Sequence, residues 1–580
     1  MTMPNHQPSA ICHRPFLAAT LPVLAAVAVY LPALRNGFIW DDPTVLLQMR
    51  AIRSFGDLVV MPPIIPKFYY RPFIFVTYLI DRGLGGETPF WFHASGIAWH
   101  ALTTLLVYLL ARRLFPADWL IATGGALLFA VFPTHVESVA WMAGRSDIIV
   151  GALVLLTTLL YLDREHAWSA WLGGATYFVA TLSKEMAVAC VLLVPLLDLL
   201  ATRRLYWARY LPLLIATPLY FVLRAHSIGA VVGGLPPNAA PVQLALDIVR
   251  ALGFYSVRAV IPIGLCAYIP NVPASPIYLI AGLVIPMLAV VLVGLTWRRT
   301  EWAPAFLTVW FFLTLAPSLT VIVRRSASAI VADRYLYVPT VASCILGAWA
   351  LVRLAQQRRL APQWPAAAFV VLAGLFAFAV IPYSRVWSDN FTFWSDVAAK
   401  VPDDALPHRE LASALINRGD LQGAEREFQR ALASPSDREG QFMTYTNLGN
   451  LYRRLRRYDD AQHAFEAAMQ LGAHPALYHN LGMALMSKIE QEQADPAAVQ
   501  RDIVKARDAF EQALTLGSRP GAPQAFLEWD GAKTHALLGQ VLFSMGDRAG
   551  AREHLEAALR LEPNGPVADA TRLYMRKLEH

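Results

Sequence analysis

The chain has 580 residues, of which 56% are hydrophobic and 16% are charged, and its mean hydropathy is +0.42. A soluble globular chain of this length does not have such a composition, so we predict a multi-pass membrane protein. The net charge of +7 fits arginine-rich cytoplasmic loops and does not indicate nucleic-acid binding. The four cysteines are too widely spaced for a disulfide framework or a zinc pattern.

The first apolar segment, 16–34, has the roughly 20 residues that a helix needs to cross a bilayer. No clean cleavage site follows it, so we expect a retained membrane helix and not a removed signal peptide. Asp41 and Asp42 come soon after this segment, next to Trp40, an aromatic residue of the kind favoured at membrane surfaces. They are candidate functional carboxylates at the membrane surface. The alternative is that they are an ordinary polar stop after a membrane helix.

Residues 35–92 form a loop that is too rich in proline and aromatic residues to be free in water, and parts such as 71–79 are predicted to be short interfacial helices. Ten more apolar segments follow and bring the predicted number of membrane helices to about eleven. They are 93–111, 119–132, 148–162, 168–182, 187–200, 210–223, 277–295, 303–322, 336–351 and 365–381. Segment 244–262 holds three charged residues and is predicted to be a re-entrant or surface segment. If it spans, every later helix inverts.

Arginines in the short loops predict the orientation. With the N-terminus inside, the cytoplasmic loops contain Arg112, Arg113, Arg164, Arg203, Arg204, Arg209, Arg298, Arg299, Arg353, Arg358 and Arg359. The opposite loops contain Asp41 and Asp42, but they also keep Arg145, Arg324, Arg325 and Arg334. The positive-inside rule therefore supports this orientation without being followed throughout.

From residue 402 the chain becomes charged and rich in alanine and leucine, with a period near 34 that is typical of tetratricopeptide repeats. The clearest of about four copies contains Tyr445, Leu448, Gly449, Tyr452, Ala461, Phe465 and Ala468. Such repeats stack into a solenoid whose concave face binds a peptide or protein, although a purely structural appendage is the alternative. We therefore predict an all-α chain with a membrane domain (1–385), a linker (386–401) and a repeat domain (402–580).

Four polar clusters recur at the predicted outer ends of the membrane helices, where unpaired charges are costly. Besides the aspartate pair they comprise His135, Glu137, Arg145, Asp147, Lys184, Glu185, Asp333 and Arg334. Transfer of a sugar to a hydroxyl needs a carboxylate base and cations that hold a phosphate leaving group. Asp41 or Asp42 fits the first role, and Arg334 with Lys184 or Arg145 fits the second. The alternative is a set of structural ion pairs, such as Arg334 with Asp333.

Six sequence motifs and the repeats occur in an order that resembles a known family. The motifs are Asn36-Gly37-Phe38-Ile39-Trp40-Asp41-Asp42, Tyr70-Arg71-Pro72, Phe132-Pro133-Thr134-His135-Val136-Glu137, Gly144-Arg145-Ser146-Asp147, Ser183-Lys184-Glu185 and Asp333-Arg334-Tyr335-Leu336-Tyr337. The chain resembles, over nearly its whole length, the transmembrane and tetratricopeptide-repeat O-mannosyltransferases and their bacterial relatives. These are integral-membrane glycosyltransferases of the GT-C class.

The resemblance implies a polyprenyl-phosphate sugar as donor and a Ser or Thr hydroxyl of a protein as acceptor, on the periplasmic side of the inner membrane. It implies an aspartate base, and we expect Asp41, with Asp42 capping the next segment or orienting Arg71. Arg334 matches a natural phosphate ligand of the family. The remaining predicted substrate-binding residues are Arg71, His135, Glu137, Asp147, Glu185 and Tyr337. The family usually has an asparagine where this chain has Gly96, so that position is given no polar role.

We expect no required cofactor, although a divalent cation held by Asp41, Asp42, Glu137 and His135 is an alternative. Three other functions are weighed against protein glycosylation. The same chemistry on a glycan or lipid acceptor would make the repeats an assembly platform. A transporter would need mid-membrane charges and repeated halves, and neither is evident. A non-catalytic scaffold would tolerate replacement of both aspartates.

Overall fold

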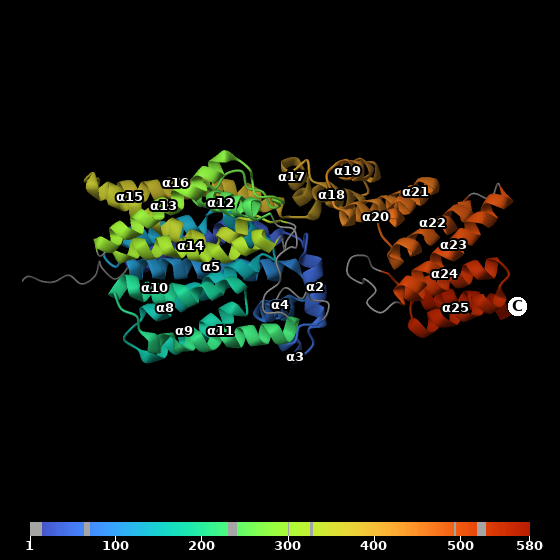
Figure 1. Ribbon diagram of the computed structural model, residues 1–580, viewed down its shortest axis with the longest axis horizontal. Helices are drawn as coiled ribbons and strands as arrows, with labels where there is room; N and C mark the ends of the chain where they lie inside the picture. Colours follow the sequence, from blue (N-terminus) through green and yellow to red (C-terminus); the bar gives the residue numbers. More distant parts are fainter. Residues whose placement is uncertain are drawn as a thin grey trace, which may run out of the picture. The chain divides into compact units, whose positions relative to one another are not determined.

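The computed structural model describes residues 14–62, 70–229, 240–299, 301–324, 329–491, 495–518 and 529–579 (Figure 1). Over these ranges the regular structure is helical, apart from one isolated bridge between Ile269 and Val331. The predicted all-α fold is therefore confirmed. Arg325 and part of the predicted loop 35–92 lie outside the described residues. The chain divides between Phe393 and Trp394 into two compact units, which are described separately.

Nine helices in the described part of the first unit are long and apolar enough to cross a membrane, as expected of a multi-pass protein. They are α1 (Arg14–Tyr30) with η1 (Leu31–Arg35), α5 (Pro89–Leu114), α8 (Arg145–Leu162), η3 (Glu185–Ala189) with α10 (Cys190–Thr202), α11 (Trp207–Ile228), α13 (Pro276–Arg298), α14 (Trp302–Arg324), α15 (Pro339–Gln357) and α16 (Gln363–Val386). A tenth is α6 (Trp119–Ala130), which bends by 46° into η2 (Pro133–His135) and α7 (Val136–Ala140).

Polar contacts define one end of this helix bundle. Arg164 pairs with Asp198 at 2.8 Å, Arg353 pairs with Glu301 at 3.2 Å, and the Gln356 amide donates to an Asp118 oxygen at 3.0 Å. These contacts join loops 112–118, 162–166, 198–209, 297–301 and 353–362, which we call the arginine end. The arginines predicted to be cytoplasmic lie here.

The opposite end is formed by loops 36–42, 131–147, 182–185 and 329–338, which we call the site end. Helix α9 (Ala167–Thr181) starts at the arginine end and finishes beside Lys184 at the site end, although its 15 residues are short for a span. The candidate spans among the described helices number nine, or ten if α6 with η2 and α7 is one span, against the predicted number of about eleven. The predicted span 168–182 corresponds to α9, which has only 15 residues.

Helix α12 (Pro241–Arg258), which covers most of the ambiguous segment 244–262, is absent from the candidate spans among the described helices. Its last residue, Arg258, pairs with Asp333 at 3.0 Å and therefore lies at the site end. Gly253 lets α12 approach α13 closely, because a Cβ there would lie 1.7 Å from the Tyr278 carbonyl oxygen. Three further helices, α2 (Asp42–Ala51), α3 (Gly56–Val59) and α4 (Pro72–Gly85), lie together at one end of the bundle (Figure 1).

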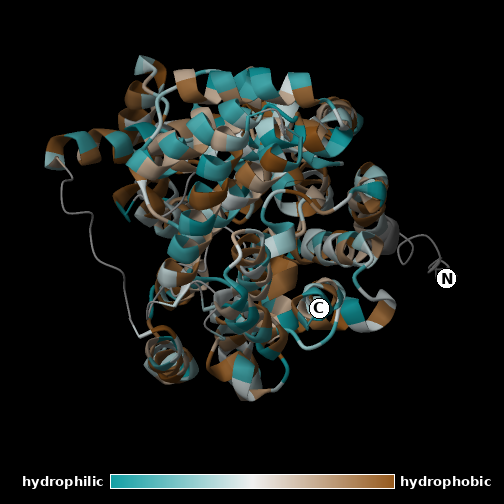
Figure 2. Cartoon of the chain, turned by 90° about the vertical axis from the view of Figure 1, so that its right-hand side faces the viewer, coloured by the Kyte–Doolittle hydropathy of each residue, from teal (hydrophilic) through white to brown (hydrophobic). Residues whose placement is uncertain are grey.

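The second unit consists of four helix pairs and a final helix. They are α18 (Ala405–Arg418) with α19 (Leu421–Ala433), α20 (Arg438–Arg454) with α21 (Tyr458–Leu471), α22 (Pro475–Gln491) with α23 (Pro496–Gly517), α24 (Gly531–Ser544) with α25 (Arg548–Leu561), and α26 (Pro566–Glu579). Figure 2 shows hydrophilic and hydrophobic residues alternating along these helices, as amphipathic packing requires. A Cβ on Gly449 would lie 2.6 Å from the Phe465 ring, which explains the small residue at that repeat position.

The predicted linker 386–401 is largely helical, because α17 (Asn390–Lys400) occupies it. The division between the two units falls inside this helix, at Phe393 and Trp394. The predicted domain boundaries, which divide the chain into 1–385, 386–401 and 402–580, stay a prediction.

Candidate active site

The loop that contains Asp41 is held to two other segments at the site end. Asn36 donates from its side-chain amide to the Ser384 carbonyl at 3.3 Å, and the Gly37 N–H donates to the Ser388 carbonyl at 2.8 Å. Trp40 has a φ of 50°, in the left-handed region that costs about 1–2 kcal/mol for such a residue. Its ring stacks on Trp141 at 4.9 Å, which offsets that strain. The turn therefore presents Asp41 from a fixed backbone.

Asp41 and Asp42 have different environments. Asp42 is fully buried, and its two oxygens accept the N–H groups of Ile39 and Ala143, each at 3.0 Å. Burial raises the pKa of Asp42 to about 7, although the two hydrogen bonds and the charge of Arg145 each lower it. Asp41 is exposed at the start of α2. The geometry favours Asp41 over Asp42 for contact with a substrate, and Asp42 holds the loop to Ala143.

Arg334 and Glu137 form an ion pair at the site end. A guanidinium nitrogen of Arg334 bonds to Glu137, and the Arg334 backbone N–H donates to the other Glu137 oxygen at 3.0 Å. The Glu137 side chain is 1% exposed, whereas that of Arg334 is 14% exposed. The Arg334 guanidinium also lies 5.5 Å from the Trp141 ring centre, so it is linked through Trp141 to Trp40 and the Asp41 loop.

Two further cations lie near Arg334. The Lys184 ammonium bonds to Asp147 at 2.5 Å, and Arg71 donates to Glu185 at 2.9 Å. Burial lowers the pKa of Lys184, and the charges of Arg71 and Arg334 lower it further, while Asp147 raises it. The Lys184 ammonium and the Arg334 guanidinium lie 5.5 and 5.0 Å from the centre of the Tyr335 ring, so these two cations contact the same ring. We call Arg71, Lys184 and Arg334 the cation triad.

The cation triad is only partly open to solvent. The side chains of Arg71 and Arg334 are 22% and 14% exposed, whereas Lys184 is a buried residue. Arg145, the third predicted phosphate ligand, is different. It is 1% exposed and bonds to Asp81 and to the Phe92 carbonyl. The structure therefore does not support a phosphate contact for Arg145, which acts as the buried partner of Asp81.

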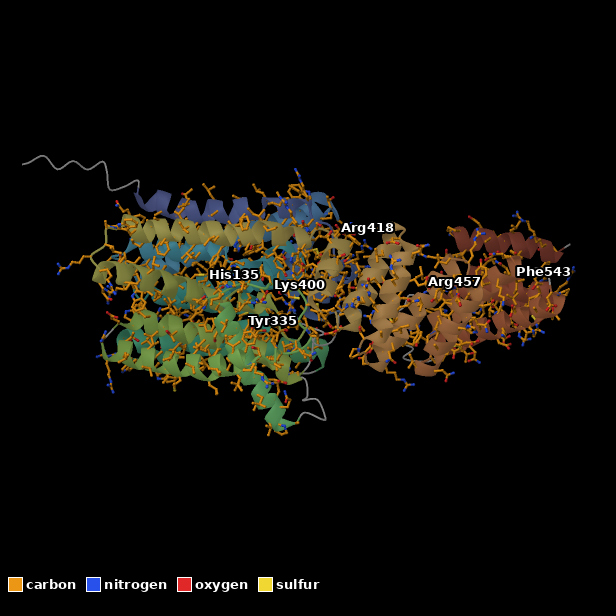
Figure 3. The ribbon with its side chains drawn as sticks, turned by 90° about the horizontal axis from the view of Figure 1, so that it is seen from above. His135, Tyr335, Lys400, Arg418, Arg457 and Phe543 are labelled. Carbon is orange, nitrogen blue, oxygen red and sulfur yellow. The ribbon has the colours of Figure 1, made fainter. Side chains whose placement is uncertain are left out.

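The predicted substrate residues His135 and Tyr337 are buried beneath the site. A ring nitrogen of His135 lies 2.7 Å from the Thr340 hydroxyl, and the Tyr337 hydroxyl lies 2.7 Å from a His100 ring nitrogen. Figure 3 labels His135 and the neighbouring Tyr335 within the membrane unit. These contacts join η2 to α15, and the residue after η4 (Asp333–Leu336) to α5. Both rings are buried, so neither is exposed to a substrate.

The divalent-cation alternative needs four side chains to converge, and the structure gives three of them other partners. Asp42 accepts backbone N–H groups, Glu137 pairs with Arg334, and His135 contacts Thr340. The suggested ion pair between Arg334 and Asp333 is also corrected. Asp333 pairs with Arg258, and Arg334 pairs with Glu137.

Sequence reasoning missed Asp81 and Arg224. Arg224 shares Glu185 with Arg71, at 3.5 Å. Asp81 stands beside Arg82 near the end of α4, and Arg224 lies near the end of α11 after the apolar stretch 210–223. A charge at the end of an apolar run was the available signal.

Two segments, 443–472 and 532–564, match models of the tetratricopeptide repeat. The chain is 32% identical over 221 residues to protein O-mannosyl-transferase Tmtc1 of Drosophila melanogaster, which covers 33% of this chain and 25% of that protein. It is 23% identical over 431 residues to protein O-mannosyl-transferase F38B6.6 of Caenorhabditis elegans, covering 70% of this chain and 61% of that protein. Among solved structures, MamA from Desulfovibrio magneticus RS-1 is 22% identical, with a TM-score of 0.24, over 30% of this chain and 84% of that chain.

The chain thus spans about a quarter of the length of the Drosophila relative. These relatives are named as protein O-mannosyl-transferases, and the repeat models match two segments of the second unit. They confirm the resemblance of this chain to the membrane-spanning O-mannosyltransferase family that carries tetratricopeptide repeats.

Proposed function

We propose that the protein is an integral-membrane glycosyltransferase that moves mannose or another hexose from a polyprenyl phosphate to Ser or Thr hydroxyls of a protein. One observation supports this most directly. The exposed carboxylate of Asp41 and the partly exposed cation triad occur at the same end of the bundle, linked through Trp40 and Trp141. The names of the relatives support the same reaction class.

In this proposal the cation triad binds the donor phosphate. Guanidinium groups bind phosphate oxygens with paired, charge-assisted hydrogen bonds, and Lys184 adds a point charge. The same cations stabilise the negative charge that grows on the phosphate as it leaves. No metal ion is needed for this role, and full activity in a chelator is the expected result.

Asp41 is the proposed general base. The acceptor hydroxyl oxygen forms a bond to the anomeric carbon of the sugar while the bond from that carbon to the phosphate oxygen breaks. The hydroxyl proton passes to Asp41, and the polyprenyl phosphate leaves with its electron pair. Direct displacement inverts the configuration of the sugar carbon.

The position of the last membrane helix supports a protein acceptor. Helix α16 finishes at the site end, where Ser388 and Asn390 bond to the loop that contains Asp41, at 2.8 and 2.9 Å. The repeat unit, which begins at Trp394, therefore follows from the same membrane side as Asp41. We place that side in the periplasm, opposite the exposed arginines of the arginine end.

Matched variants of the two aspartates test the proposal with purified protein, a radiolabelled polyprenyl-phosphate mannose and a Ser-containing peptide. Asp41→Asn is expected to lower turnover by roughly 10²–10⁴-fold with unchanged thermal stability. Asp42→Asn is expected to lower stability, because an amide offers one oxygen to two N–H donors. If Asp41→Asn keeps full turnover, Asp41 is not the base and Glu137 becomes the next candidate.

The acceptor is tested separately by mass spectrometry of envelope proteins from cells with and without the gene. Loss of a hexose from specific Ser or Thr sites is expected. Loss of a hexose from a glycan or a lipid would retain the glycosyltransferase and reject the protein acceptor.

A further inference from the structure

The Asn390 side chain bonds directly to the residue that precedes Asp41. Its Oδ1 atom accepts the Trp40 N–H at 2.9 Å, and the two residues are 350 positions apart in the sequence. Asn390 is the first residue of α17, the helix that follows the last candidate span. A bond between such distant positions forms only in the folded chain, so its role can be separated from the formation of either local segment.

The start of α17 is capped by a different residue. Asp389 Oδ1 accepts the N–H groups of Phe391 and Thr392, each at 3.0 Å, and its Oδ2 accepts the Thr392 hydroxyl at 2.9 Å. A side chain in this position satisfies N–H groups that the first turn of a helix leaves unpaired. The Asn390 oxygen is therefore not needed for the cap, and it is directed to Trp40 instead.

The backbone of Trp40 is strained, so its conformation depends on outside contacts. Its φ of 50° lies in the left-handed region, which is unfavourable for a residue with a Cβ atom. Relaxation of Trp40 to a negative φ would rotate the chain at the next residue, which is Asp41. The direction of the Asp41 carboxylate therefore depends on the contacts that hold Trp40.

Aromatic rings hold the side chain of Trp40 as well. Its ring stacks on Trp141 at 4.9 Å and lies 5.5 Å from the ring of Phe393 in α17. Phe393 is fully buried and packs on Trp387 at 4.9 Å. Ring contacts tolerate small changes of angle, whereas a hydrogen bond weakens steeply when it bends. The Asn390 bond is thus the contact that fixes the direction of the Trp40 N–H.

We propose that Asn390 is a positioning residue for Asp41, which holds Trp40 in the left-handed conformation and thereby directs the carboxylate toward the acceptor hydroxyl. This rests on the proposed function, in which Asp41 is the general base. Asn390 acts through Trp40 and not on the reacting atoms.

Replacement of Asn390 by alanine removes the acceptor and leaves the other contacts of the loop in place. The Gly37 N–H still donates to the Ser388 carbonyl at 2.8 Å, so the loop is expected to loosen without detaching. Loss of one hydrogen bond to a backbone N–H lowers the population of the productive loop, and kcat is expected to fall by about 3–30-fold. The donor KM is expected to stay unchanged, because the cation triad belongs to other segments.

Three variants of the purified full-length protein test this role with a radiolabelled polyprenyl-phosphate mannose and a Ser-containing peptide. Asn390→Ala is expected to lower kcat, and Asn390→Asp, which keeps an acceptor oxygen, is expected to recover most of it. Thr392→Val removes the side-chain bond to Asp389 in the same helical turn and is the matched control, with the kcat of the wild type. An equal loss of kcat in Asn390→Ala and Thr392→Val would overturn the proposal, because both would then act by destabilising α17.

Combination with Asp41→Asn provides a second test, because a positioning residue acts only through the residue that it positions. In the Asp41→Asn protein, Asn390→Ala is expected to change the remaining turnover by less than about twofold. Losses that multiply in the double variant would contradict the positioning role.

Hydrogen exchange of residues 37–42, followed by mass spectrometry, needs no sugar transfer and separates this proposal from the proposed function. Asn390→Ala is expected to speed exchange of the Trp40 amide, which loses its acceptor, whereas Asn390→Asp and Thr392→Val are expected to exchange like the wild type. Unchanged exchange in Asn390→Ala would overturn the positioning role even if the wild type transfers sugar. A wild type that transfers no sugar would instead overturn the proposed function, whatever the exchange shows.

Discussion

Removal of Arg334 is expected to have two separable effects, on stability and on donor binding. Glu137 is 1% exposed and accepts both a guanidinium contact and the backbone N–H of Arg334. Arg334→Ala leaves this carboxylate buried without its counter-charge, which costs about 3–5 kcal/mol. It also removes a charge-assisted bond to the donor phosphate. At about 1.5–3 kcal/mol, that loss raises the donor KM by about 10–150-fold.

The double variant Arg334→Ala with Glu137→Gln separates these effects. It removes the buried charge, so most of the lost thermal stability is expected to return, while the donor KM stays raised. Arg334→Lys is expected to recover donor use only partly, because a point charge does not reproduce a bidentate contact. Initial rates at varied donor and fixed acceptor, together with melting curves in detergent, give both quantities. A double variant with the wild-type donor KM would show that Arg334 only pairs with Glu137.

Three further predictions concern topology, packing and pH. A reporter active only in the periplasm, fused after His580, is expected to be active, and a cytoplasmic signal would reject the proposed orientation. Gly253→Ala is expected to destabilise the protein by about 1–3 kcal/mol or more through the clash with Tyr278, whereas Gly294→Ala has open space and is expected to be neutral or mildly stabilising. Because the folded state raises the pKa of Asp42 to about 7, its contribution to stability is complete below about pH 4. This contribution is lost as the pH rises from about 4 to about 7. A melting temperature that does not decline over this pH range would contradict the raised pKa of Asp42.

Helix positions and the surface location of the Asp41 loop were predictable because both depend on local sequence. An apolar run of span length and the polar residues that end it can be recognised without knowing any partner. The segment now seen as α12 was separated from the spans because three charges interrupt its apolar run, and α12 is absent from the candidate spans among the described helices. The repeats were equally clear, since Gly449 and Phe465 occupy repeat positions that meet in space.

The pairing of the charges was not predictable, because each pair joins distant parts of the chain. Arg145 and Asp81 are 64 positions apart, and Arg334 and Glu137 are 197 apart. The sequence identified Arg334, together with Lys184 or Arg145, as candidates for binding the phosphate. Only the fold shows that Arg145 is enclosed by α4 and α5 whereas Arg334 remains partly exposed. Burial, which depends on tertiary packing, therefore distinguishes a structural arginine from a candidate ligand.

The two ends of the bundle differ in how their cations are paired. Arginines at the arginine end, such as Arg113 and Arg204, are exposed and hydrated, so they favour the cytoplasmic side. At the site end, Arg334 and Lys184 are each bonded to a carboxylate. An arriving donor phosphate must then compete with Glu137 and Asp147 for these cations. The binding energy of the donor is the difference between the two pairings, and Glu137→Gln is therefore expected to tighten donor binding.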